Sequence, residues 1–131
     1  MKIFLGGTCN NSIWRDKLIP MLNIDYFNPV VDDWNDMAKK NEIYQKEVCD
    51  YLLYTITPKL KGFYSIAEVT YDSIKNPNKT IFCFLKEDDG IYFDEQELNS
   101  LNAIANMIKN NGGKVLYSLK EIANYVNKKG L

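Results

Sequence analysis

The sequence contains no histidine, the side chain that most often moves protons near neutral pH. Acid and base chemistry would therefore have to use carboxylates or tyrosines, whose pKa values depend on their surroundings. Cysteine is scarce as well: Cys9, Cys49 and Cys83 are odd in number and show no C-x-x-C spacing. These absences argue against a disulfide framework and against a zinc site, so we expect no bound metal.

Long apolar runs and dense basic runs are also missing. The first apolar run, Ile3-Phe4-Leu5, is too short for a signal peptide, and no other run approaches membrane-spanning length. We therefore expect a cytoplasmic protein that does not contact membranes. The formal net charge is −1, and no lysine or arginine cluster is dense enough to follow a phosphate backbone. A nucleic-acid polymer is not expected as a partner, whereas a single nucleotide is compatible with this charge.

What the chain does contain is a regular alternation of apolar runs and helical patterns. Its 131 residues are 46% hydrophobic, enough for one core, so residues 1–131 are predicted to form a single domain. Each expected strand is followed by a segment with helical periodicity, which predicts an α/β fold with right-handed crossovers. We expect a five-stranded parallel sheet in the flavodoxin-like or Rossmann-like order 2-1-3-4-5, with helices on both faces. The expected strands are residues 2–5, 25–31, 50–56, 79–85 and 114–117.

In this strand order, the loops after Leu5 and Ile56 flank one crevice at the carboxyl edge of the sheet. The first loop begins Gly6-Gly7-Thr8, and its glycines would let the backbone approach a ligand closely. The next helix is expected to start with Ser12 as its N-cap. The loop matches neither G-x-G-x-x-G nor the P-loop, so an ordinary turn and a phosphate or sugar site both remain open.

Glu68 follows the second loop and has two interpretations. Ser65-x-x-Glu68 fits a capping box, in which the two side chains bond to each other's backbone amides at the start of a helix. Alternatively, a carboxylate at the rim of this crevice is placed to act as a nucleophile on a sugar carbon.

Two further acidic positions are candidates, each with a structural alternative. Asp33 and Trp34 lie in an expected loop, where the acidic residues could begin the next helix or Trp34 could stack on a flat base. Asp50 heads the third strand, where an aspartate is usually a turn or cap residue. Between them, residues 37–49 are expected to be helical, with a loose apolar stripe. That stripe is Met37, Ala38, Ile43, Tyr44 and Val48.

Three segments together resemble the nucleoside 2-deoxyribosyltransferase family. They are Ile3-Phe4-Leu5-Gly6-Gly7, Asp50 at the head of the third strand, and Gly62-Phe63-Tyr64-Ser65-Ile66-Ala67-Glu68. The run from Phe27 to Trp34 further resembles the short, single-domain branch of this family. The chain departs from the family at Phe4, where a tyrosine is common, and at Gly62, where an aspartate is common.

The resemblance implies cleavage of an N-glycosidic bond in a nucleoside or nucleotide, by base exchange or by hydrolysis. It implies that Glu68 is the nucleophile, that Asp50 assists it, with Asp33 as second candidate, and that no cofactor is needed. Binding without turnover, as a nucleotide-sensing module, is the alternative. The resemblance also implies a homodimer or larger oligomer, and an aromatic cluster predicts the same. The cluster is Tyr51, Tyr54, Phe63, Tyr64 and Tyr71. The expected substrate-binding residues are Gly6, Gly7, Thr8, Asp33, Trp34, Gly62 and Ser65.

Overall fold

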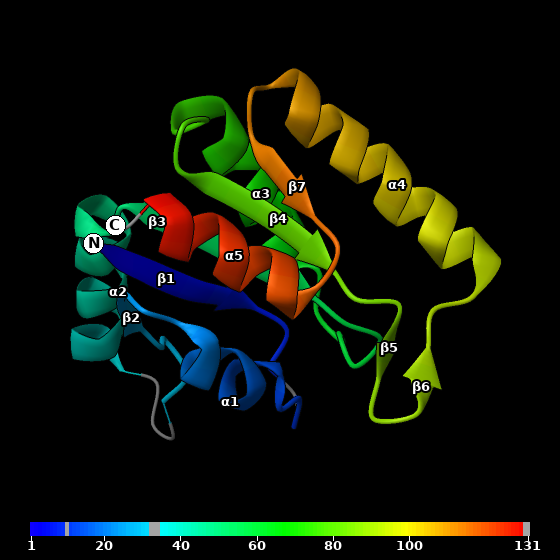
Figure 1. The fold of residues 1–131 in the computed structure, drawn as a ribbon, viewed down its shortest axis with the longest axis horizontal. Helices are drawn as coiled ribbons and strands as arrows, with labels where there is room; N and C mark the ends of the chain where they lie inside the picture. Colours follow the sequence, from blue (N-terminus) through cyan, green and yellow to red (C-terminus); the bar gives the residue numbers. More distant parts are fainter. Residues whose placement is uncertain (10, 32–34, 130–131) are drawn as a thin grey trace.

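A computed structural model describes residues 1–9, 11–31 and 35–129. Its centre is a five-stranded sheet in the order β2-β1-β3-β4-β7, in which every neighbouring pair is parallel (Figure 1). This confirms the fold class and strand order that the sequence predicts. The strands are β1 (Lys2–Gly7), β2 (Asp25–Phe27), β3 (Tyr51–Ile56), β4 (Thr80–Phe84) and β7 (Lys114–Leu116).

Helices lie on both faces of this sheet, because each crossover returns the chain to the same sheet edge. In Figure 1, α1 and α5 lie in front of the strands and α3 lies behind them. The helices are α1 (Trp14–Leu18), α2 (Asp36–Val48), α3 (Tyr64–Lys75), α4 (Glu95–Asn110) and α5 (Leu119–Lys129), with a 3₁₀ turn η1 (Ile19–Met21) after α1. None of the helices in the described ranges is long and apolar enough to cross a membrane.

Alternate residues of each central strand face the two helical layers. Along β1, Ile3 and Leu5 pack with α1 and α5, whereas Phe4 packs on the other side with α3 and α4. All six residues of β3 are buried, and so are all five of β4. Strands covered on both faces read as continuous apolar runs, and this is why their positions could be predicted from the sequence.

The chain between β4 and α4 forms a small hairpin. Strands β5 (Glu87–Asp88) and β6 (Ile91–Tyr92) pair antiparallel. Asp89 and Gly90 form the turn with φ values of 56° and 80°, the left-handed geometry typical of Asp-Gly hairpins. Strands of two residues are too short to show alternation, so the sequence pattern could not reveal them.

Helix α2 does not pack on the protein through the apolar stripe that the sequence predicts. None of its residues is buried, and four of the five apolar residues in its expected stripe are exposed. Its carboxyl end is instead held by Lys79, whose Nζ donates to the carbonyl oxygens of Lys46, Glu47 and Cys49 at 3.1–3.2 Å. A lysine in this position satisfies carbonyls that have no partner within the helix. The exposed stripe residues are Met37, Ile43, Tyr44 and Val48.

Gly7 ends β1 in a conformation that other residues rarely adopt. Its φ is +114°, and a Cβ atom there would overlap the backbone carbonyl oxygen of Thr55 in β3. Immediately after it, the Thr8 amide donates to that same Thr55 carbonyl at 2.9 Å. The carboxyl ends of β1 and β3 therefore approach more closely than a side chain at residue 7 would permit.

We expect Gly7→Ala to destabilise the protein by roughly 3 kcal/mol or more, because backbone strain and overlap with β3 add together. Gly90→Ala is the matched control: Gly90 also has a positive φ but nothing within 4 Å of an added Cβ, so its loss should be about 1 kcal/mol. Urea denaturation followed by circular dichroism measures both. Equal losses would show that the close approach at Gly7 has no energetic consequence.

Candidate functional site

A pocket opens at the carboxyl edge of the sheet, between the segments that leave β1 and β3. The chain after β1 enters α1 on one face and the chain after β3 enters α3 on the other, which makes this the switch point of the sheet. The pocket has a volume of about 260 Å³. It is lined by Phe4, Gly6, Gly7, Cys9, Arg15, Pro29, Val30, Val31, Glu42, Ser65 and Glu68. Four of the residues expected from the sequence, Gly6, Gly7, Ser65 and Glu68, therefore come together.

Gly6 keeps this pocket open next to the sheet. A Cβ atom on Gly6 would lie 3.0 Å from ring atoms of both Phe4 and Tyr54, so a side chain would compete with those rings for space. Thr8, by contrast, does not line the pocket. Its side chain is buried, and its Oγ1 accepts the Thr57 amide proton at 3.0 Å. In this structure Thr8 therefore joins the loop after β1 to the loop after β3.

Arg15 is a pocket residue that sequence reasoning missed. It lies in α1, is 6% exposed, and donates to the carbonyl oxygens of Leu5, Gly7 and Thr8. Burial lowers the pKa of Arg15 to about 10, against the opposing effect of Cys9 and Asp16, so the side chain stays cationic at neutral pH. It therefore fixes the glycine turn from the α1 side. Nothing in the sequence separates it from an ordinary helical arginine.

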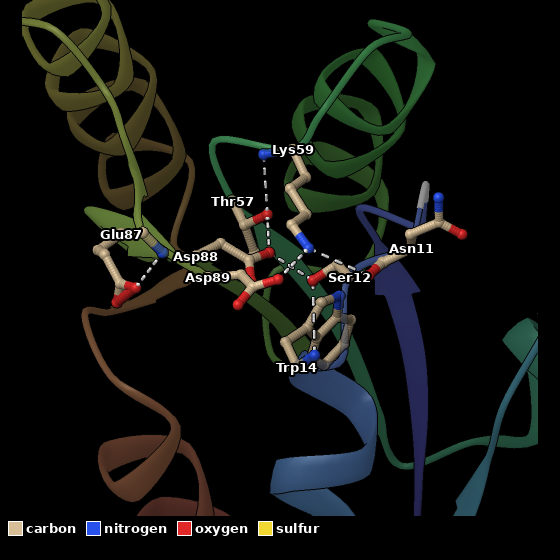
Figure 2. A network of polar contacts seen from close by, with 9 residues as sticks. Asn11, Ser12, Trp14, Thr57, Lys59, Glu87, Asp88 and Asp89 are labelled. Carbon is tan, nitrogen blue, oxygen red and sulfur yellow. Dashed lines mark hydrogen bonds and ion pairs between the residues drawn. The ribbon is translucent and has the colours of Figure 1, made fainter.

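Three loops at the same edge are joined by a polar network around Asp88 (Figure 2). Asp88 in the β5–β6 hairpin is 6% exposed, and its Oδ2 accepts hydrogen bonds from Ser12 Oγ at 2.5 Å and Thr57 Oγ1 at 2.6 Å. Ser12 belongs to the loop after β1 and Thr57 to the loop after β3. Helix α1 has Ile13 at its N-cap position, one residue after the expected N-cap Ser12, and Ser12 Oγ accepts the Trp14 amide proton only at a long 3.5 Å.

Glu68 is not part of a capping box. Helix α3 begins at Tyr64, so Phe63 occupies the N-cap position and Ser65 already lies inside the first turn. No side chain caps this helix. Glu68 instead forms an ion pair with Lys46 of α2, with 3.1 Å between Lys46 Nζ and Glu68 Oε2. The capping-box interpretation of Ser65-x-x-Glu68 is therefore wrong, and helix capping does not explain why Glu68 lies at the pocket.

Lys46 also pairs with Asp72, one turn further along α3, at 3.0 Å from Nζ to Oδ2. The same Asp72 oxygen accepts a hydrogen bond of 2.5 Å from the hydroxyl of Tyr54 in β3. Burial, followed by the charges of Asp72 and Glu68, raises the pKa of Tyr54 far above its ordinary value, so the phenol remains protonated. Burial opposes the charge on Lys46, but its bonds with Asp72 and Glu68 outweigh burial and raise its pKa.

Glu42 is a second carboxylate at the pocket that the sequence did not single out. It lies on α2 one turn before Lys46, and the pocket is lined by both Glu42 and Glu68. Burial raises the pKa of Glu42, and the negative charge of Glu68 raises it further, while Lys46 acts in the opposite direction. A carboxylic acid with a raised pKa beside an ionised one is the arrangement that separates acid and base roles.

Asp50 and Gly62, two further expected site residues, do not line this pocket. Asp50 is exposed at the amino end of β3, the opposite edge of the sheet, where its Oδ2 accepts the Lys2 amide proton at 2.8 Å. Asp50 therefore does not lie beside Glu68, because a residue that precedes a parallel strand lies at the amino end of the sheet, away from the pocket. Gly62 is exposed in the loop before α3 with nothing within 4 Å of an added Cβ. Asp33 and Trp34 lie outside the described residues.

The described part of the chain offers no cluster of three or more Cys, Asp or Glu side chains that would hold a metal ion. The fold and the pocket define an open α/β protein with a pocket at the switch point of a parallel sheet, lined by two carboxylates and an arginine among other residues. A family model described as Nucleoside 2-deoxyribosyltransferase like matches residues 1–87, and the chain belongs to this family.

The matched residues run from β1 into the first residue of β5 and include Glu42, Lys46 and Glu68. Searches of curated proteins and of solved structures found no match to this chain. The family membership thus covers the pocket and its charged residues, whereas α4, β7 and α5 lie beyond the matched part.

The different surroundings of Ser65 and Asp94 predict different effects of their removal. Asp94 forms a complete capping box with Glu97 at the start of α4, so Asp94→Ala should cost about 1 kcal/mol of stability. Ser65 makes no capping bond, so Ser65→Ala should change stability by less than about 0.5 kcal/mol. Chemical denaturation of the two variants makes the comparison. A loss at Ser65 as large as that at Asp94 would restore the capping-box interpretation.

Proposed function

We propose that the protein cleaves the N-glycosidic bond of a nucleoside or nucleotide, with Glu68 as the nucleophile. The observation that carries this proposal is the position of Glu68 on the pocket at the switch point, beside Glu42. One oxygen of Glu68 is bonded to Lys46, and its Oε1 has no bonded partner within residues 1–9, 11–31 and 35–129. A carboxylate fixed through one oxygen presents the other to the anomeric carbon of a sugar.

The reaction has two steps. Glu68 attacks the anomeric carbon, the bond from this carbon to the base nitrogen breaks, and the base leaves with a proton from Glu42. A glycosyl ester on Glu68 results. Water or a second base then attacks the same carbon, the ester bond breaks, and Glu42 takes up the proton that the incoming nucleophile loses. Two displacements retain the configuration of the sugar, and a sugar without a 2-hydroxyl forms the oxocarbenium-like transition state more readily.

The pocket also has an apolar part of its lining, formed by Phe4, Pro29, Val30 and Val31. Such a lining displaces water from a bound sugar and strengthens the electrostatic interactions at the reacting carbon. Trp34 follows this segment in the sequence, and its expected stacking on the base stays a prediction. The resemblance implies that Asp50 assists the nucleophile. Proton transfer is proposed here for Glu42 instead, because Glu42 is at the pocket and Asp50 is not.

A binding module without turnover is the second candidate, and two observations favour it. The ion pair with Lys46 withdraws electron density from Glu68, which makes a carboxylate a weaker nucleophile. The aspartate that is common in the family at the position of Gly62 is also missing. In this alternative, Glu68 would bind the sugar hydroxyls as an acceptor without attacking the ring.

Substitutions of the two carboxylates test the proposal. Glu68→Gln should lower base release from deoxynucleosides or deoxynucleotides by about 10³-fold or more, because an amide cannot form the glycosyl ester. Glu42→Gln should lower it by about 10²-fold. Because Glu42 must be protonated to act, wild-type activity should fall as the pH rises through the raised pKa of Glu42, and this fall should be absent in Glu42→Gln.

Chromatography of the free base over a range of pH values measures these effects. Glu47→Gln, an exposed substitution on the same helix that does not line the pocket, is the matched control. Equal rates for wild type and Glu68→Gln would contradict the nucleophile assignment. A wild-type protein that binds a nucleotide but releases no base would establish the second candidate function.

We also propose that the protein forms a homodimer or larger oligomer through α2 and α3. Tyr51 and Tyr54, two members of the expected aromatic cluster, are buried in the core and cannot contribute. Tyr64, Tyr71 and Ile74, however, lie along one side of α3 and are 58–77% exposed. With the exposed apolar residues of α2, which lies beside α3, they form an apolar surface of the kind that marks an interface.

Light scattering at micromolar concentration should therefore give at least twice the mass of one chain. Ile74→Asp should shift the protein toward the monomer, because a charge on this side of α3 would have to be desolvated. A monomer at every concentration would refute the proposal. A dimer that is unaffected by Ile74→Asp would place the interface elsewhere.

A further inference from the structure

Lys46 connects the pocket to the protein core. Its ammonium group lies 3.1 Å from Glu68 Oε2 and 3.0 Å from Asp72 Oδ2, so one cation on α2 bonds to two carboxylates on α3. The two acceptors differ in their surroundings, because the Asp72 side chain is 6% exposed and the Glu68 side chain is 17% exposed and lines the pocket. The pairing at Asp72 is therefore the anchor, and the pairing at Glu68 is the one that a ligand can reach.

The anchor is fixed from the sheet. Tyr54 is 1% exposed, and its hydroxyl donates to the same Asp72 oxygen that Lys46 contacts. The Tyr54 ring also lies under the ammonium group, with Lys46 Nζ 5.6 Å from the ring centroid. A buried aspartate is stable only when its charge is compensated, and here a phenol and an ammonium supply that compensation. Lys46 cannot move without leaving Asp72 with a single neutral partner.

We propose that Lys46 is a positioning residue that orients the Glu68 carboxylate for attack, and that Tyr54 and Asp72 hold Lys46 in place. This role rests on the proposed function. Lys46 binds Oε2 only, so the carboxylate is fixed in rotation while Oε1 stays available. The ammonium also lowers the electrostatic cost of keeping Glu68 ionised so near Glu42.

The main test compares kinetic constants for base release by the full-length protein. Lys46→Met should lower kcat about 30-fold and change KM by less than about twofold, because the orientation of Glu68 is lost while the pocket wall remains. Lys46→Arg should recover most of this loss, since a guanidinium can also bridge two carboxylates. Lys75→Met is the control: it removes a fully exposed positive charge from the neighbouring helix and should leave kcat unchanged.

A second variant covers the case in which Lys46→Met does not fold because Asp72 is left buried and unpaired. Lys46→Met combined with Asp72→Asn removes both charges, and it should fold and show the same fall in kcat. Tyr54→Phe, which deletes only the hydroxyl, should lower kcat several-fold and be more active than Lys46→Met. A purely structural ion pair would change thermal stability in these variants but not kcat.

Nuclear magnetic resonance of the lysine ammonium groups gives a readout that is independent of turnover. The pKa of Lys46 should lie above its ordinary value in the wild type, and it should fall in both Glu68→Gln and Asp72→Asn. Turnover by folded Lys46→Met equal to that of Lys75→Met would overturn the positioning role alone. A wild type that releases no base would overturn the proposed function, and the positioning role with it.

Discussion

The structure depends on one close contact between the backbones of β1 and β3. Gly7 lies against Thr55 where a Cβ atom would overlap the carbonyl oxygen, and the Thr8 amide closes this contact with a hydrogen bond. The segments that follow these two neighbouring strands go to opposite faces of the sheet, to α1 on one face and to α3 on the other. The pocket is the space left between these segments. Arg15 below the turn and Asp88 beside it hold the loops that surround that space.

Charge at the pocket is arranged across two helices. Helix α3 supplies Glu68 and Asp72, while α2 supplies Glu42 and Lys46, so each helix carries groups that need the other. Lys46 on α2 is bonded to Glu68 and Asp72, and Arg15 adds a second cation at the pocket. Burial, followed by the charge of Glu68, raises the pKa of Glu42. A carboxylate held at the reacting carbon suits a reaction whose transition state carries positive charge on the sugar ring.

The sheet could be predicted because its central strands are buried on both faces and read as unbroken apolar runs. Glu68 could be found because it follows such a strand through a glycine-bearing loop. Glu42 and Lys46 could not, because the apolar residues of α2 suggested that Ile43 and Tyr44 faced the core. In fact these side chains are exposed, and the charged residues face the site. Periodicity identifies two sides of a helix, but only tertiary structure decides which of them is covered.

Lys79 attaches the carboxyl end of α2 to the rest of the protein. This helix buries none of its own residues, and its carboxyl end is bonded to a single ammonium group. Local unfolding of α2 would therefore expose little apolar surface and leave the sheet intact, and its main cost would be the loss of the Lys46 bonds to Asp72 and Glu68. Glu42 and Lys46 would depart together in that opening. A ligand that contacts either side chain would be bound most tightly by the closed form, so occupancy of the pocket and order of α2 would be thermodynamically linked.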